Sequence, residues 1–187
     1  MNIIEESEKY ALSEMEKYGT PIPIHFNLSR QKAIKLAKKL NANEIIVEVG
    51  AILMDLKLGQ ALKEGRLSEH VSMSVEASRA FLEKFSLNQE TEKKIINCIE
   101  AHHRQIEFSC IEAEICANAD CYRFIHPKGF FAYLTLLGKR HDQFSDCLNQ
   151  AEMKLDEKNT ILSLDICKDE LSEYYSTLKR FIADSKD

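Results

Sequence analysis

The sequence predicts an all-α protein folded as a single helical domain. Only three prolines and six glycines occur among 187 residues, and because the prolines fall at positions 21, 23 and 127, long helices can run uninterrupted elsewhere. No segment alternates apolar and polar residues over the length of a strand. A chain of this length can bury one core but is short for two, so we expect one domain over residues 1–187.

The first half of the chain is divided into helices by glycines and by residues that cap helices. An amphipathic helix from about residue 3 to 18 ends at Gly19. Asn27 can cap a basic helix that reaches about residue 40, and Asn41, with Glu44 three residues later, has the spacing of a capping box. The next helix is expected to run through AILMDL to about residue 62, before the Gly-Arg pair at 65–66.

The second half continues in the same way. Ser68 restarts a helix to about residue 85, and Asn88 caps another that reaches about residue 105. SCIE at 109–112 is a capping box that opens a helix to about residue 125, and HPKG at 126–129 is a turn. Helices to about residue 157 and from about 165 to 183 complete the chain. We expect a core over about 20–135, with the C-terminal helices at about 129–183 packed on it.

Net charge and composition exclude some classes of binding partner. A net charge of -5 and a pI near 5.7 give no basic excess for phosphates, so we expect neither a long nucleic acid nor an acidic membrane as a partner. The N-terminus does not resemble a signal peptide, and no window approaches the apolar length of a membrane span. The six cysteines form no CxxC pair and are expected to be reduced, which indicates a cytoplasmic protein.

Several polar residues fall on helix faces that are otherwise apolar. Asp55 and Asp120 each share a stripe with apolar or small residues, and so do His70 and His102. Burying an ionised carboxylate is costly unless a cation, a metal ion or several donors meet it. One such residue alone is typical of a hydrogen-bonded core position. A shared partner is indicated by the whole series, which runs His25, Asp55, His70, His102 or His103, and Asp120.

That order resembles the HD-domain superfamily of metal-dependent phosphohydrolases over about residues 20–135. EVGAILMDL resembles the apolar helix that leads to the His-Asp pair of the family. HVSMSVEASRAFLEKF, IINCIEAHHR and EAEICANADCYRFI resemble the segments that carry its later histidines and its last aspartate. The resemblance implies an HD-type helical bundle in which a first divalent metal is held by His25, Asp55 and Asp120. It also implies that a second metal or a phosphate is bound by His70 and by His102 or His103.

The chain departs from this pattern at the signature itself, because the histidine of the His-Asp pair is Met54. A thioether is a weak ligand for the divalent ions that imidazoles and carboxylates bind, so metal affinity is expected to fall. A different His-Asp pair, His141 and Asp142, has polar neighbours and is interpreted as a chance dipeptide on a solvated helix face.

The resemblance implies hydrolysis of a small phosphate ester or a nucleotide. A divalent ion, which can be Mn, Fe, Ni, Co, Mg or Zn, polarises a phosphoryl oxygen and activates water, and Asp55 orients that water or takes its proton. Lys57, Arg104 and Arg123 lie close in sequence to the ligands and either contact phosphate or are solvated surface charges.

Two other interpretations remain open. Because of Met54, the chain is alternatively a non-catalytic HD-fold module that binds a nucleotide or phosphate. A third interpretation is a structural helical protein that uses its C-terminal helices for partner contact. The apolar stripes after residue 129 either pack internally or form a homodimer interface.

Overall fold

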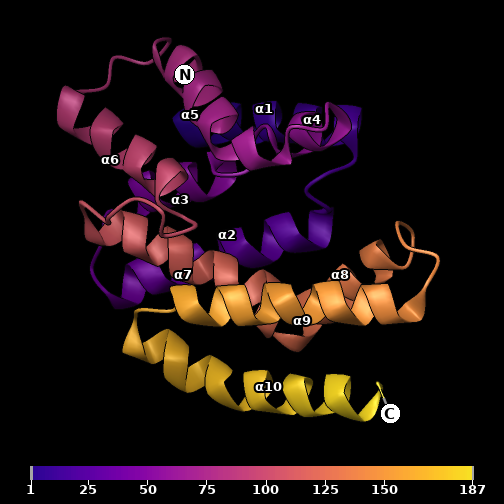
Figure 1. Ribbon diagram of the computed structural model, residues 1–187. Coiled ribbons are helices and arrows are strands. Elements are labelled where there is room, and N and C mark those ends of the chain that lie inside the picture. Colours follow the sequence, from indigo (N-terminus) through magenta and orange to yellow (C-terminus); the bar gives the residue numbers. More distant parts are fainter. Residues whose placement is uncertain (1, 187) are drawn as a thin grey trace.

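The all-α expectation is confirmed, since a computed structural model describes residues 2–186 and no strand occurs among them (Figure 1). The helices are α1 (Ile3–Tyr18), α2 (Pro23–Lys39), α3 (Glu44–Leu53), α4 (Leu58–Lys63), the 3-10 turn η1 (Leu67–Glu69), α5 (His70–Leu82), α6 (Gln89–Glu100), α7 (Ile111–Ile125), α8 (Pro127–Leu137), α9 (Phe144–Ile161) and α10 (Asp165–Asp184). None of the helices in this described part is both long and apolar enough to cross a membrane.

Two predicted helix starts are wrong. α2 begins at Pro23 and not at Asn27, because proline suits the first helical turn, where its missing N–H leaves no bond unmade. α3 is capped by Asn43, whose Oδ1 accepts hydrogen bonds from the second and third N–H groups of the helix at 3.1 and 3.2 Å. Asn41 has φ of 53° and so follows the end of α2 in the left-handed region, which asparagine tolerates.

Other boundaries also differ from the prediction. α6 ends at Glu100 and not near residue 105, and the capping box predicted at 109–112 does not form, since Cys110 precedes α7. The predicted HPKG turn is the start of α8, with Pro127 in its first turn and the ring of His126 accepting from Lys128 N–H at 3.3 Å. The predicted long helix to about residue 157 is therefore two helices, α8 and α9.

α7 is the central helix of the bundle. It packs against α2, α3, α6, α8, α9 and α10, and every residue from 115 to 125 is buried. In Figure 1 the last two helices, α9 and α10, run side by side along the lower edge, and α9 also packs on α8. Charged side chains on α7 therefore face other helices and not water, which makes their partners decisive for stability.

The α7–α8 connection requires a glycine at position 129. A Cβ there would lie 2.4 Å from the carbonyl oxygen of Arg123 and 2.7 Å from that of Tyr122. We expect Gly129→Ala to lower the free energy of unfolding by about 1–3 kcal/mol, as overpacking typically does. Urea unfolding measures this, with Gly138→Ala as the control because its nearest contact would be 3.6 Å. Equal losses in both variants would contradict the close-packing argument.

Candidate functional site

Asp55 lies in a turn that interrupts the helix predicted to run to about residue 62. The N–H groups of Leu56 and Leu58 bond to carbonyls three and not four residues earlier. The buried Ser74 hydroxyl on α5 accepts from Lys57 N–H at 3.0 Å and donates to the carbonyl of His70 at 2.7 Å. Ser74 thus ties this turn to the start of α5, and Asp55 Oδ1 lies 3.7 Å from His70 Nε2.

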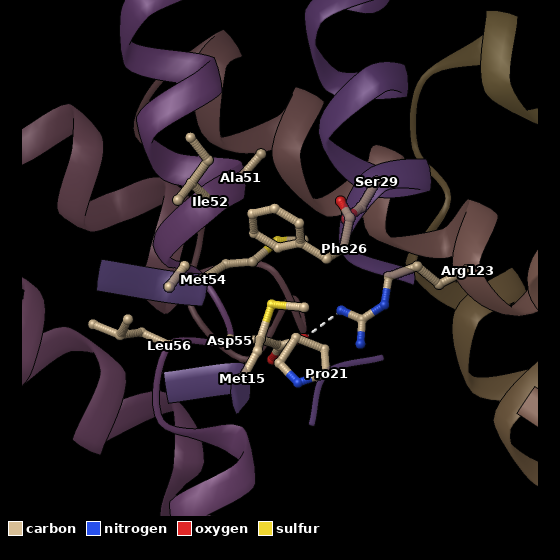
Figure 2. A pocket seen from close by; sticks show the side chains of 11 residues that line it. Met15, Pro21, Phe26, Ser29, Ala51, Ile52, Met54, Asp55, Leu56 and Arg123 are labelled. Atoms are coloured by element: carbon tan, nitrogen blue, oxygen red, sulfur yellow. Dashed lines mark hydrogen bonds and ion pairs between the residues drawn. The ribbon is translucent and has the colours of Figure 1, made fainter. Parts of the chain in front are cut away.

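Met54 fills an apolar pocket next to Asp55 and contributes no ligand. Its side chain is 1% exposed, and Met15, Phe26 and Ile52 line the same small cavity of about 10 Å³ (Figure 2). A cavity of this size is at the lower limit for a single water molecule. The thioether therefore acts as core packing at the position where the resemblance expects an imidazole.

Buried cations bond three of the four carboxylate oxygens of Asp55 and Asp120. A single nitrogen, Arg123 Nη1, donates to Asp55 Oδ2, as Figure 2 shows, and to Asp120 Oδ1 at 2.6 Å. Lys158 Nζ, on α9, lies 2.6 Å from Asp120 Oδ2. The Lys158 side chain is fully buried, and that of Arg123 is 5% exposed. The fourth oxygen, Asp55 Oδ1, faces histidines.

These contacts keep both carboxylates ionised. Burial alone would raise the pKa of Asp55, but the guanidinium of Arg123 and the nearby histidines outweigh burial and hold that pKa well below its usual range. Burial likewise opposes ionisation of Asp120, and the charges of Lys158 and Arg123 outweigh it, so that the Asp120 pKa is also lowered. The two carboxylates and two cations form a neutral buried cluster.

His25 lies near this cluster but is bonded elsewhere. Its Nε2 is 3.0 Å from the carbonyl oxygen of Gly129, so Nε2 carries the hydrogen and donates. Burial and the charge of Arg123 lower the pKa of His25 to about 4, which keeps the ring neutral near pH 7. His25 lines the same pocket as Asp55 and Asp120.

The first metal set does not fit a divalent ion in this arrangement. Of the four carboxylate oxygens that Asp55 and Asp120 would offer beside His25, only Asp55 Oδ1 lacks a bond to Arg123 or Lys158. An ion among these three residues would have to displace a buried cation. The fold brings His25, Asp55 and Asp120 together as expected, but Arg123 and Lys158 bond the carboxylate oxygens that the resemblance assigns to the ion.

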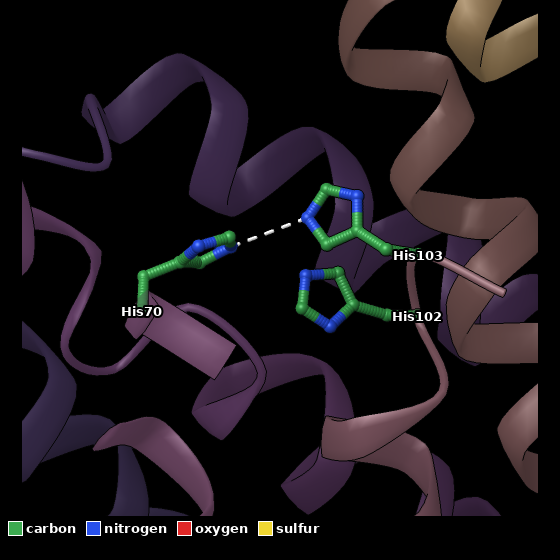
Figure 3. A group of neighbouring side chains, drawn as sticks. All are labelled: His70, His102 and His103. Carbon is green, nitrogen blue, oxygen red and sulfur yellow. Dashed lines mark hydrogen bonds between the residues drawn. The ribbon is translucent and has the colours of Figure 1, made fainter. Parts of the chain in front are cut away.

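The three remaining histidines of the series form a cluster beside Asp55. His70, at the start of α5, faces His102 and His103, which follow α6, and one nitrogen from each ring lies within 4.8 Å of the others (Figure 3). His102 is fully buried. Both neighbouring histidines therefore take part, although the sequence left open which of the two does.

Hydrogen bonds fix the tautomers of this cluster. Nδ1 of His70 and Nδ1 of His102 each lie 2.7 Å from a backbone carbonyl, of Leu67 and Ile99, so both donate and their Nε2 atoms carry lone pairs. His103 Nδ1 lies 3.0 Å from Lys158 Nζ and 3.3 Å from Glu157 Oε1, and because the closer ammonium can only donate, Nδ1 accepts from it. His103 Nε2 then carries hydrogen and donates to His70 Nε2 at 3.2 Å.

His102 Nε2 is the exception in this network. It is buried, has no hydrogen-bond partner among residues 2–186, and lies 3.5 Å from Asp55 Oδ1. Two acceptors that face each other need a hydrogen-bond donor or a cation between them. Metal-ligating histidines commonly donate their other nitrogen to a carbonyl, as His70 and His102 do. Their Nε2 atoms and Asp55 Oδ1 therefore fit a divalent ion, provided that His70 Nε2, which has a single lone pair, exchanges its hydrogen bond from His103 for the ion.

A cavity of about 430 Å³ lies beside Asp55 and the histidine cluster. Its polar lining includes His25, Asp55, His70, His103, Asp120, Arg123, Arg140, Lys154, Glu157 and Lys158. Phe124, Tyr133, Leu58 and Leu62 are among the apolar residues that line it. Arg140 is exposed, and no carboxylate within the described residues lies within ion-pair distance of it. The cavity thus combines an apolar wall with side chains of both charges, and Arg140 is a cation at it without a carboxylate partner within the described residues.

The three basic residues considered for phosphate contact have different surroundings. Lys57 pairs with Glu14 at 2.8 Å, and Arg104 donates to the carbonyl of Thr160 at 3.3 Å; neither lines the cavity. Arg123 does line it, but its Nη1 is committed to the two aspartates. Of the three, only Arg123 is placed to meet a ligand.

Sequence reasoning missed the contribution of α9. Lys154, Glu157 and Lys158 line the cavity, and Lys158 completes the buried charge cluster. A signal was present, because Lys158 falls on the same helical stripe as Ala151, Leu155 and Ile161, which are all buried. A lysine on such a stripe indicates a buried anionic partner, here Asp120.

Sequence comparisons relate part of the chain to two known proteins. No family model matches the chain. Ribonuclease Y from Finegoldia magna is 35% identical over 110 residues, and Ribonuclease Y from Fusobacterium nucleatum is 27% identical over 135 residues. These matches cover 59% and 72% of this chain but only 20% and 25% of the relatives, so the chain spans about a quarter or less of their length.

A solved structure extends the likeness to nearly the whole chain. The crystal structure of a predicted HD superfamily hydrolase from an uncultured Thermotogales bacterium superposes with a TM-score of 0.65, covering 96% of this chain and 91% of that one at 15% identity. The resemblance noted in the sequence is thus confirmed at the level of the fold, including its C-terminal helices. The chain has the fold of the HD superfamily.

Proposed function

We propose that this chain is an HD-type phosphohydrolase with one divalent ion, held by His70, His102 and Asp55. The observation that carries the proposal is the buried, unpartnered Nε2 of His102, 3.5 Å from the one carboxylate oxygen that Arg123 and Lys158 leave free. Burying two opposed acceptors is costly without a donor or a cation to satisfy them, and a divalent ion is the partner that His70 Nε2 could share. Two imidazoles and a carboxylate are ligands that Mn, Fe, Co, Ni and Zn accept.

The proposed chemistry divides between the ion and the chain. The ion, when bound, supplies a Lewis acid that polarises the phosphoryl group and activates water. Asp55, held through Oδ2 by Arg123, keeps Oδ1 directed at the histidines, where it would help to hold the ion and orient the attacking water. His103 would give up its hydrogen bond to His70 Nε2 when that nitrogen binds the ion. Arg140 lines the cavity as a cation for the phosphate, whereas Lys154 pairs with Glu157 at 2.8 Å.

The proposed substrate is a nucleotide or a short oligonucleotide end. The cavity of about 430 Å³ has the size of small-ligand sites, and its apolar side, including Phe124 and Tyr133, suits a base or sugar. The two relatives are named ribonucleases, which favours a nucleotide phosphate over other esters. Because the net charge of the chain is -5, we still predict that it binds long nucleic acid only weakly.

The test measures metal content and phosphodiester hydrolysis in the same preparations. Wild-type chain, purified without chelator and exposed separately to Mn, Co, Ni and Zn, is expected to hold about one equivalent and to hydrolyse bis(p-nitrophenyl) phosphate. His102→Ala is expected to lose both, because it removes one of three ligands. His141→Ala, which changes a histidine outside the cavity lining, is the matched control and should keep both. Equal metal content in His102→Ala and wild type would exclude this ligand set.

A second candidate function is a non-hydrolysing module that binds a phosphorylated ligand. It is favoured by the buried cations, which neutralise both carboxylates without any ion. This candidate predicts nucleotide binding without metal or turnover, weakened roughly tenfold by Arg140→Ala through loss of one charge-assisted contact. Lys139→Ala, at a neighbouring exposed position outside the cavity lining, should leave the affinity unchanged.

A further inference from the structure

We infer that Arg123 and Lys158 replace the first metal ion of the HD site, so that Asp120 is a charge partner and not a metal ligand. The inference concerns the space between Asp55 and Asp120 alone. It is independent of whether His70, His102 and Asp55 hold an ion.

The geometry of Arg123 carries the first step. One nitrogen, Nη1, bridges an oxygen of Asp55 to an oxygen of Asp120, residues that lie 65 positions apart in the sequence. A bridging ion would make the same pair of contacts. The ammonium of Lys158 then takes the second oxygen of Asp120 at 2.6 Å, which leaves that carboxylate with no free oxygen.

The charge balance carries the second step. Two carboxylates contribute two negative charges, and Arg123 and Lys158 contribute two positive charges, which is the charge of one divalent ion. The four side chains are only 0–8% exposed. Adding an ion would leave two uncompensated positive charges in a buried site, which is strongly unfavourable. The internal cations therefore exclude the ion as well as replace it.

Met54 carries the third step. Its thioether lies in a small pocket lined mostly by apolar residues, with Asp55 and Arg123 at it, and adds neither charge nor a hard ligand (Figure 2). The replaced ligand, the bridging guanidinium and the buried ammonium come from three separate parts of the chain, the end of α3, α7 and α9. All three features disfavour an ion at the same place.

Metal stoichiometry tests the inference. Chains are exposed to Mn, Co, Ni or Zn, freed of loosely held ions and measured by elemental analysis. Wild type is expected to bind at most one equivalent, and Asp120→Asn the same amount as wild type. Met54→His/Arg123→Ala, which restores the imidazole and removes the bridge, is expected to bind one equivalent more than wild type. A second equivalent in wild type, or loss of an equivalent in Asp120→Asn, would overturn the inference.

Controls separate this result from the proposed function and from misfolding. Met54→His/Arg104→Ala removes an arginine outside the cavity lining and is expected to gain no ion. A gain in this control equal to that of the Arg123 variant would show that the guanidinium does not exclude the ion. Circular dichroism and urea unfolding check that each variant is folded. If Asp120→Asn unfolds, the metal content of wild type and of the two double variants tests the inference. His102→Ala tests the other site, so either proposal can fail alone.

Discussion

Lys158→Met is expected to lower the free energy of unfolding by about 3–5 kcal/mol, which is the usual cost of breaking a buried ion pair. The Lys158 ammonium is fully buried and 2.6 Å from Asp120, and its removal leaves the cluster with one uncompensated negative charge. Methionine keeps much of the side-chain volume, so the loss reports charge and not a cavity. Urea unfolding at pH 7 measures the difference from wild type.

A double-mutant cycle identifies the partner. Lys158→Met/Asp120→Asn removes one charge of each sign, so its loss should be clearly smaller than the sum of the two single losses. Lys168→Met provides the matched control, because Lys168 is half exposed, pairs only with the exposed Asp165, and should cost about 1 kcal/mol or less. Additive losses in the cycle would mean that Lys158 and Asp120 do not stabilise each other.

The fold class could be predicted because it follows from local patterns in the sequence. Helical stripes and the scarcity of proline and glycine predicted helices, which the structure shows, and Asn88 caps α6 as predicted. Some errors in helix boundaries lie where tertiary contacts decide the backbone. Ser74, on another helix, captures the N–H of Lys57 in the turn after Met54, and no local pattern contains that partner. The end of α6 is instead a local feature, since the ring of His102 bonds back to the Ile99 carbonyl three residues earlier.

The site was predictable in its members but not in its bonding. Helical periodicity marks Asp55, Asp120, His70 and His102 as polar residues on buried stripes, and the structure places them around one cavity or beside it. The three-residue spacing of Asp120 and Arg123 predicts an ion pair along one helix. It does not predict that the same nitrogen also reaches Asp55, because that contact depends on how α7 packs against α3.

One consequence is that an HD fold and an HD metal centre are separable here. The fold depends on apolar packing around α7, and Met54 is among the buried apolar residues. The centre depends on charge, and the chain supplies two positive charges of its own at the first position. Fold likeness therefore supports the architecture, while the chemistry must be argued from the atoms that remain free, chiefly His102 Nε2 and Asp55 Oδ1.

The pH dependence of stability is expected to report His25 directly. Burial and the charge of Arg123 lower its pKa to about 4, against about 6.5 in an unfolded chain. Between these values the unfolded chain binds the proton and the folded chain does not, so stability is full above about pH 6.5 and is lost as the pH falls toward 4. The difference corresponds to about 3 kcal/mol for this one buried group. Urea unfolding at pH 7 and at pH 4.5 measures it.

His25→Gln isolates that contribution, because glutamine offers an N–H to the Gly129 carbonyl but binds no proton. The variant should lose less stability than wild type between the two pH values, and the remaining loss includes His103, whose pKa burial also lowers to about 4. His141→Gln, outside the cavity lining, should follow wild type. If His25→Gln also loses as much as wild type, the imidazole is not held neutral by the fold, and the packing of Arg123 beside it must differ from the arrangement described.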